Sequence, residues 1–563
     1  MKRFKLNIII AGALTLGLFS SCSDSFLNSV PKTQLVDENF YKTEADAEMA
    51  LVGCYDGYQQ TSSGFPIYLV AEVASDECFG GTGANDCRGY QMIDRLDKNQ
   101  STSDNNVFND TWKSYYKGIF RCNNLLQKLP GIAKWNSSKD SVNNITEKRI
   151  EGETRFIRAL MYFDLVRMFE NIPLLTEPST ANIPQATPLE TYKVIVADLK
   201  FAAANIPANA YPKAQAATND GRVTRYAAEA LLARVYLFYT GYYAKDDLGV
   251  TKPEILAGLE DVIASNEFDL LPDFKTLWRA ASYRVDTLKG VKDIGGKDSV
   301  YLNKQFYAGK GNKEVVFAQK FNSTSDYAGN ADGNGWIVMM GMRGCNFSPY
   351  GKGWGACTVN PQLVNAYPTG DKRRTASVID LVGENIESIF NIADQKEYTG
   401  YTVKKYSPTA LPVRNGDNSK QTSDTGGSKD FQQSQDQDYV QIRYADILLM
   451  AAELGSPNAV AYFNKVHTRA GLTAVASVSL SDIQTERRYE FAFEGIRYWD
   501  LLRSGLDNAA NTIAASAQTV KSGGVADHIT YDVTKIKATK GFMQIPNTQI
   551  TLSGGVLIQN QGW

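Results

Sequence analysis

Apolar residues recur at spacings of three and four throughout the first half of the chain. The clearest stretch holds Trp112, Tyr115, Tyr116, Ile119 and Phe120, and a Pro-Gly pair at 130–131 follows it. A second stretch runs over 150–169. Because residues at these spacings share one face of an α-helix, both stretches predict amphipathic helices.

Helix-start signals support the same interpretation. Thr187, Pro188 and Glu190 form one of them: threonine caps the helix, proline occupies the first turn, and glutamate reaches back to the cap. Further helices are predicted over 224–242 and 253–265. Paired helices of this length are typical of a helical repeat.

The pattern changes between residues 271 and 437, where Gly, Ser, Asn, Tyr and Lys dominate. A short β-like run lies at 314–319, and helical periodicity returns over 444–453, 459–469 and 481–502. The sequence therefore predicts a mainly α protein, with a helical-repeat body and a loop-rich irregular lobe that contains short strands.

The N-terminus has the pattern of a bacterial export signal. A basic start at 1–3 precedes an apolar run over 6–18, and Phe-Ser-Ser leads to Cys22. The run is too short to cross a membrane as a helix. We interpret 1–21 as a lipoprotein signal peptide and Cys22 as the acylated residue that anchors the mature chain. Phe19 stands where such signals more often have leucine, so an ordinary secreted protein cut elsewhere is the alternative.

Composition excludes several classes of function. The 59 basic and 61 acidic residues nearly cancel, which does not favour a nucleic acid or an anionic membrane surface as the partner. Only His467 and His528 are present, and no Cys/His cluster has metal-ligand spacing. We therefore expect no metal and no cofactor. The 30 Tyr, 25 Phe and 7 Trp favour a face that stacks on a ligand.

Six cysteines remain after Cys22. Cys78–Cys87 and Cys345–Cys357 are the possible local disulfides, since each would close a glycine-rich loop. Free thiols are the alternative for all six, and Cys54 and Cys122 fall on helical patterns that suit core positions.

The most enzyme-like constellation is Glu486, Glu490 and Glu494, spaced four apart. Glycoside hydrolysis needs two carboxylates that flank a sugar across a cleft, whereas these would lie side by side on one helix face. Arginines interleave with them at 487, 488 and 497, so we interpret the group as a structural ion-pair network. A glycan-degrading enzyme is the weaker alternative.

Five segments, taken in order, resemble the SusD/RagB family. They are 153–163 with 171–174, 221–237, 442–453, 485–501 and 557–563. The last departs from the family in having Gln561 where proline is more common. The resemblance implies a non-catalytic protein with a tetratricopeptide-like helical body. It also implies attachment to the outer face of the outer membrane, a TonB-dependent SusC-like transporter as partner, and an oligosaccharide or polysaccharide as ligand. A peptide-binding lid of a RagAB-like importer is the alternative.

The resemblance divides the chain into four parts. They are the signal peptide 1–21, a SusD-like helical region 22–270, a loop-rich ligand-binding lobe 271–437, and a C-terminal SusD/RagB helical region with an extended tail 438–563.

Two glycine-rich loops, 78–90 and 327–354, are the candidate glycan-binding segments, because aromatic residues in such loops have less core to fill. We expect Trp336 and Trp354 to act as stacking platforms. Asp86, Arg88 and Asn346 would bond sugar hydroxyls. The same loops add four further candidates: Phe79, Tyr90, Arg343 and Tyr350.

Overall fold

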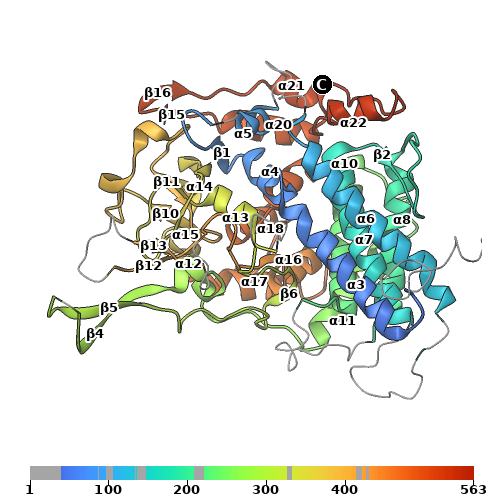
Figure 1. Cartoon of the computed structure of the whole chain (residues 1–563), viewed down its shortest axis with the longest axis horizontal. Helices are drawn as coiled ribbons and strands as arrows, with labels where there is room; N and C mark the ends of the chain where they lie inside the picture. Colours follow the sequence, from blue (N-terminus) through green and yellow to red (C-terminus); the bar gives the residue numbers. More distant parts are fainter. Residues whose placement is uncertain are drawn as a thin grey trace, which may run out of the picture.

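The computed structural model describes residues 40–86, 88–96, 106–132, 135, 147–207, 221–293, 295–325, 332–413, 421–425 and 430–563. Helices dominate the first half of the chain (Figure 1). They are α3 (Glu44–Gln59), α4 (Ile67–Val73), α5 (Gly89–Arg95), α6 (Asn109–Lys128), α7 (Glu147–Phe169), α8 (Pro188–Asn205), α10 (Arg225–Tyr243) and α11 (Lys252–Ala264).

Threonine caps fix where several of these helices begin. At α8, the Thr187 side chain accepts a hydrogen bond from the backbone N–H of Glu190, and the glutamate carboxylate accepts one from the N–H of Thr187. Thr43 and Thr251 form the same reciprocal arrangement at α3 and α11. Each pair satisfies backbone donors that a helix end leaves without partners, which confirms the predicted start of α8.

The helices pack as a continuous array. Helix α3 lies against α6, α6 against α7, α7 against α8, α8 against α10, and α10 against α11. The array continues from α11 to α16 (Tyr444–Glu453) and α17 (Ala459–Arg469), which come from the last quarter of the chain. The prediction of a helical, tetratricopeptide-like body is confirmed, and C-terminal helices complete it.

The predicted helix over 481–502 is two helices, α18 (Leu480–Phe491) and α19 (Arg497–Arg503). Gly495 breaks it with a φ of +72°, a conformation that favours glycine. A Cβ at this position would also collide with the Tyr439 hydroxyl. The periodicity continues across the break because both helices bury their apolar face in one core. The chain then forms α20 (Leu506–Ala515), α21 (Val533–Ala538) and α22 (Asn547–Leu552).

A four-stranded antiparallel sheet connects the helical body to the irregular lobe. Its strand order is β1 (Cys78–Gly81), β9 (Ala356–Val359), β11 (Tyr401–Val403) and β10 (Val378–Asp380). The predicted β-like run becomes β6 (Val315–Gln319), which pairs with β14 (Tyr439–Arg443). The lobe is therefore built around strands that come from both ends of the chain.

The remaining elements are short, apart from a hairpin that projects from the lobe (Figure 1). The hairpin is β4 (Arg284–Lys292) with β5 (Asp298–Asn303). The other strands are β2 (Ile172–Pro173), β3 (Gln185–Ala186), β7 (Met342–Arg343), β8 (Lys352–Gly353), β12 (Ala410–Leu411), β13 (Thr422–Ser423), β15 (Thr519–Ser522) and β16 (Val525–His528). The short helices are α12 (Arg279–Ser282), α13 (Gly335–Met340), α14 (Pro361–Ala366) and α15 (Lys372–Ser377).

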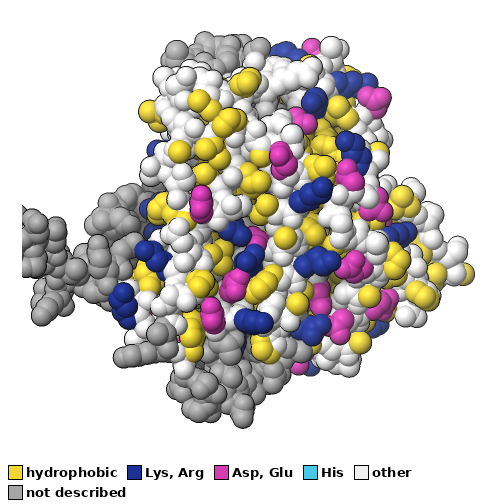
Figure 2. Space-filling model, turned by 90° about the vertical axis from the view of Figure 1, so that its right-hand side faces the viewer, with side chains coloured by type: hydrophobic (Ala, Val, Ile, Leu, Met, Phe, Trp, Pro, Cys, Tyr) yellow, Lys and Arg dark blue, Asp and Glu magenta, His cyan; other side chains and the backbone are white. Residues whose placement is uncertain are grey.

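One main hydrophobic core runs from α3 to the C-terminal helices, and small satellite clusters lie in the lobe and beside β1. The face of the helical body in Figure 2 mixes basic, acidic and apolar side chains without a large patch of one kind. No helix within the described ranges is long and apolar enough to span a membrane. The domain boundaries at 270 and 437 stay a prediction.

Candidate ligand-binding surface

The two glycine-rich loops meet because β1 pairs with β9. Arg343, at the end of β7, joins them: its Nη1 lies 3.0 Å from Oδ2 of Asp86, and its Nε lies 3.0 Å from Oδ2 of Asp394. The Arg343 side chain is 20% exposed and both aspartates are 41% exposed. We call these residues the Asp86–Arg343–Asp394 cluster. It places one cation and two anions at the surface in a fixed arrangement.

A tight turn holds Asp86 in place. Its Oδ2 accepts hydrogen bonds from the backbone N–H of Gly83 and the hydroxyl of Thr82, both at 3.0 Å. A Cβ at Gly83 would collide with the Arg343 guanidinium and with the Asp86 carboxylate. Glycine at position 83 is therefore what lets the two loops approach.

The segment 394–397 supports the cluster from the lobe. The Gln395 amide donates to the carbonyl of Gly355 at 2.9 Å. The Glu397 carboxylate accepts from the N–H of Gly81 at 2.8 Å and pairs with Arg95 at 2.6 Å. Sequence reasoning missed this segment, because a few polar residues beside a 3₁₀ turn resemble any solvated loop.

This surface offers groups that suit a polyhydroxyl ligand. Carboxylates accept hydrogen bonds from vicinal hydroxyls, and a guanidinium donates to them in a forked geometry. Trp354 is half-buried and packs against the main core. Arg88 is also partly exposed, directly before α5. The structure thus brings Asp86 and Arg343 into contact, and Arg88 follows Asp86 by two positions in the sequence.

The structure contradicts the expectation of an exposed ring at Trp336. This residue lies in α13 and is fully buried. Its ring centroid is 4.7 Å from that of Tyr406, 4.9 Å from that of Tyr68 and 5.2 Å from that of Tyr439. The loop interpretation was wrong because the short apolar helix that follows Asn334 is flanked by glycines, which conceal its core character.

Three other predicted aromatics are also buried. Phe79 is 0% exposed and packs with Val520 and Ile529, whereas Tyr90 packs edge-on against Phe65. Tyr350 is 6% exposed, and its hydroxyl donates to Glu384 at 2.6 Å. These rings anchor the loops and present no face to a ligand.

Asn346 has a comparable supporting role. Its side-chain amide donates to the carbonyl of Gln421 at 3.0 Å, and its side-chain oxygen accepts from the N–H of Lys352 at 2.8 Å. Both hydrogen bonds hold backbone segments of the lobe in place. They use the side-chain amide and oxygen of Asn346, which are the groups expected to bond a sugar.

The structure does not form the predicted Cys345–Cys357 disulfide. Cys345 and Cys357 are free thiols that belong to different hydrophobic clusters. Cys357 instead contacts the free thiol of Cys78 across the β1–β9 pair. Cys87, the predicted partner of Cys78, lies outside the described residues, as does Cys22.

The three glutamates of α18 and the following turn form an ion-pair network in the core. Arg443 lies 2.5 Å from Glu490 and 2.7 Å from Glu494, and Arg373 lies 2.6 Å from Glu486. The structural interpretation is therefore confirmed, but these cations come from β14 and α15 rather than from the interleaved arginines. All three carboxylates are at most 3% exposed, so they do not face a substrate cleft.

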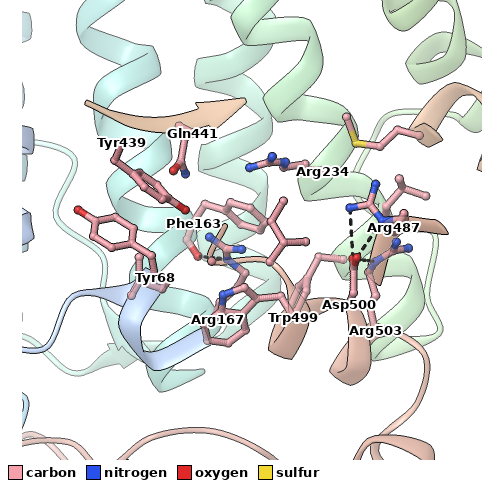
Figure 3. A pocket seen from close by; sticks show the side chains of 16 residues that line it. Tyr68, Phe163, Arg167, Arg234, Tyr439, Gln441, Arg487, Trp499, Asp500 and Arg503 are labelled. Carbon is pink, nitrogen blue, oxygen red and sulfur yellow. Dashed lines mark hydrogen bonds and ion pairs between the residues drawn. The ribbon is translucent and has the colours of Figure 1, made fainter. Parts of the chain in front are cut away.

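A second charged network lines the small cavity of Figure 3. Asp500 bridges Arg487 and Arg503 at 2.8 and 2.7 Å, and Gln441 and Trp499 complete part of the wall. The cavity volume is about 40 Å³. Ligand pockets generally measure about 300–1,000 Å³, so this cavity is too small for a glycan.

A larger groove of about 520 Å³ lies between α3 and β6. Two of the polar side chains along it have clear protein partners. Gln59 donates to the carbonyl of Lys320 at 2.7 Å, and Arg222 pairs with Glu153 at 2.8 Å. The groove is large enough for a small ligand, and its polar groups are bonded within the protein, as are those of the Asp86–Arg343–Asp394 cluster.

Comparison with known families matches two large parts of the chain. Residues 313–563 match the family described as "SusD family", and residues 39–237 match the family described as "Starch-binding associating with outer membrane". The chain belongs to the SusD/RagB family. This finding confirms the resemblance carried by the five sequence segments.

Other SusD/RagB proteins are similar over nearly their whole length. "SusD-like protein P2" of Formosa agariphila is 25% identical over 551 residues, which cover 90% of this chain and 92% of that protein. A SusD-like protein of Bacteroides ovatus is 24% identical over 536 residues, which cover 89% and 83% of the two chains.

Solved structures share the same fold. A "Laminarin binding SusD-like protein" is 26% identical with a TM-score of 0.66, covering 93% of this chain and 100% of that one. Surface glycan-binding protein A from Bacteroides thetaiotaomicron, solved with laminarihexaose, covers the same shares at 21% identity with a TM-score of 0.68. At that identity the second likeness shows the fold alone.

Proposed function

We propose that this SusD/RagB protein is a surface-exposed, lipid-anchored glycan-binding protein. It captures an oligosaccharide or polysaccharide and delivers it to a TonB-dependent SusC-like transporter in the outer membrane. Capture and delivery require that the protein binds the glycan and changes its position relative to the transporter; no covalent bond is made or broken.

The observation that carries the proposal is the similarity to the laminarin-binding SusD-like protein, at 26% identity over 93% of the chain. The Asp86–Arg343–Asp394 cluster supports it, because it supplies exposed acceptors and donors, and the partly exposed Trp354 belongs to the same glycine-rich loop as Arg343. The apolar face of a sugar ring packs on such a ring while its hydroxyls bond the charged groups.

Burial of Glu486, Glu490 and Glu494 argues against glycan degradation. Hydrolysis requires an acid and a base or nucleophile on opposite sides of the sugar, within reach of solvent. Glu486, Glu490 and Glu494 instead neutralise arginines in the core.

Anchoring through Cys22 and exposure to the exterior are part of the same proposal. The signal pattern at 1–22 supports them, together with the outer-membrane association in the description of the family that matches 39–237. We also propose that the four parts bounded at 21, 270 and 437 are the functional divisions of the chain.

A calorimetric panel tests the function. The chain without residues 1–22 would be titrated with neutral glycans, acidic glycans and a peptide mixture, alongside Arg343→Ala and the control Arg284→Ala. Arg284 is an exposed arginine of the β4–β5 hairpin, remote in sequence from the cluster. We expect one glycan class to bind, with binding weakened at least tenfold by Arg343→Ala and unchanged by Arg284→Ala. Binding of peptides without any glycan response would replace the proposal by a peptide importer.

A further inference from the structure

Four buried cysteines form two contacting pairs, neither of which is local in sequence. The Cys54 thiol contacts that of Cys122, and the Cys78 thiol contacts that of Cys357. Each of the four side chains is at most 1% exposed. Thiols that lie against one another in a core are positioned for cross-linking, whereas isolated core cysteines act only as small apolar residues.

The crossing of α3 and α6 explains the first pair. A Cβ on Gly57 would lie only 2.9 Å from the Cα of Gly118, so the two helices approach closely at these glycines. Arg121 donates to the carbonyl of Gly53 at 2.9 Å, which shows that the helices run antiparallel. Cys54 precedes Gly57 by about one turn and Cys122 follows Gly118 by about one turn, so they face each other across the crossing.

The register of β1 and β9 explains the second pair. Cys78 lies opposite Val359 and Phe79 opposite Thr358, so Cys357 is the diagonal neighbour of Cys78 on the same face of the sheet. The thiols of these two residues come close enough to form a hydrogen-bonding contact. The pair joins the segment that begins the first glycine-rich loop to the segment that ends the second.

We propose that Cys54–Cys122 and Cys78–Cys357 are disulfides in the exported protein. Each bond would form by thiol–disulfide exchange with a dithiol oxidase of the extracytoplasmic compartment. One cysteine thiolate attacks the oxidase disulfide, and the second then displaces the oxidase from the mixed disulfide. Two cysteine thiols lose two hydrogens, and the oxidase disulfide is reduced to two thiols. This inference uses the export step of the proposed function and is independent of the ligand.

Burial dictates when this exchange takes place. The thiolate is the reactive form, and burial raises the pKa of the Cys78 and Cys357 thiols. The contact with Cys122, together with burial, raises the pKa of the Cys54 thiol. The bonds therefore form while the chain is folding outside the cytoplasm, and afterwards they are shielded from reductants.

The second bond bears on the candidate binding surface. Cys357 lies two residues after Gly355, whose carbonyl accepts from Gln395, the residue that follows Asp394 of the Asp86–Arg343–Asp394 cluster. A covalent link from Cys78 to Cys357 fixes the two loops relative to each other at their base. The first bond fixes α3 against α6 in the helical body.

Peptide mapping of the full chain tests the inference. Protein exported with its own N-terminal signal is quenched in acid, denatured, alkylated and digested without reductant. We expect linked peptides that join 54 with 122 and 78 with 357, each lighter than its reduced parts by two hydrogen atoms. Protein made in the cytoplasm without residues 1–22 provides the reduced control.

Alkylation of both members of a pair in the exported protein would overturn the inference for that pair, and so would linkage of either member to another cysteine. Thermal unfolding supplies a second readout. Reductant present throughout refolding should lower the Tm of the wild type and leave that of a Cys54→Ala/Cys122→Ala/Cys78→Ala/Cys357→Ala variant unchanged. Equal Tm values of the wild type with and without reductant would also contradict it. Glycan binding by the reduced protein would leave the proposed function intact.

Discussion

Replacing Trp336 by alanine distinguishes a core residue from a binding platform. The indole is fully buried between the rings of Tyr68, Tyr406 and Tyr439. Removal of a buried Trp or Phe costs about 3–5 kcal/mol, since apolar contact is lost and a cavity remains. The Trp336 Nε1–H has no hydrogen-bond partner within the described residues, so its removal relieves part of the cost. We expect a loss of about 3 kcal/mol.

Denaturant unfolding, followed by far-ultraviolet circular dichroism, measures this loss. Trp336→Phe is the matched control: it keeps an aromatic ring among the three tyrosines but loses the unpartnered N–H and the rest of the five-membered ring, so we expect a smaller loss than for Trp336→Ala. Glycan binding by the still-folded Trp336→Ala protein should persist, because the ring does not reach the surface. A loss below about 1 kcal/mol together with abolished binding would refute this reasoning and restore Trp336 as a platform.

Three further variants probe other features. Gly83→Ala should weaken glycan binding about tenfold with little effect on stability, as measured by calorimetry, because the added Cβ displaces the Arg343 guanidinium; unchanged affinity would contradict this. Burial, opposed in part by Arg497, raises the pKa of Glu77 to about 7. The stability that the neutral form contributes is present below about pH 4.5 and is lost as pH rises through 7. In unfolding titrations, Glu77→Gln should therefore stabilise the protein by at most about 3 kcal/mol at pH 8 and by almost nothing at pH 4.5. Equal effects of the substitution at both pH values would contradict this prediction. Glu490→Gln should cost about 3–5 kcal/mol, because it leaves Arg443 and its neighbours less compensated in the core; a neutral result in the same assay would contradict it.

The ion-pair network around Glu490 makes the stability of the protein sensitive to acid. Burial alone would raise the pKa of Glu490, but the guanidinium groups of Arg469, Arg443 and Arg373 hold it well below its ordinary value. The stabilising contribution of the ionised group is therefore present above about pH 4.5 and is lost as pH falls below that range. Glu77 and Glu490 thus act in opposite directions, and stability is expected to be greatest between their transitions.

Local sequence signals predicted the helical body well. The capping residues at Thr187 and the spacing of Trp112 and Tyr115 reflect interactions within a few residues, which remain visible in the linear pattern. The predicted helix over 481–502 was broken at Gly495, because the break depends on the approach of Tyr439 from a distant strand. Long-range packing of this kind leaves little trace in a single sequence.

Only part of the candidate surface could be predicted, because it too depends on long-range packing. Asp86 and Arg343 were recognised in their loops, but their ion pair depends on the β1–β9 pairing, and Asp394 depends on a turn with no sequence signature. The prediction is wrong for Trp336 and Tyr350, because a glycine-rich context does not imply exposure in this lobe. Glycines in this lobe instead allow close approach of backbone segments, which buries neighbouring rings.

The cysteine contacts show most clearly that a single sequence does not reveal long-range packing. Short spacing favoured Cys345–Cys357, whereas the fold places Cys357 beside Cys78 and Cys54 beside Cys122. Both contacts join segments that only tertiary structure brings together.

The most direct test of the central claim is a calorimetric titration of the chain without residues 1–22 with laminarin-derived hexasaccharide, comparing the wild type with Arg343→Ala and Trp354→Ala. The account predicts saturable binding by the wild type, at least tenfold weaker binding by both variants, and Tm values within a few degrees of one another. Wild-type affinity in both folded variants would contradict the location of the site. Absence of binding to this and to every other glycan of the panel would contradict the proposed function.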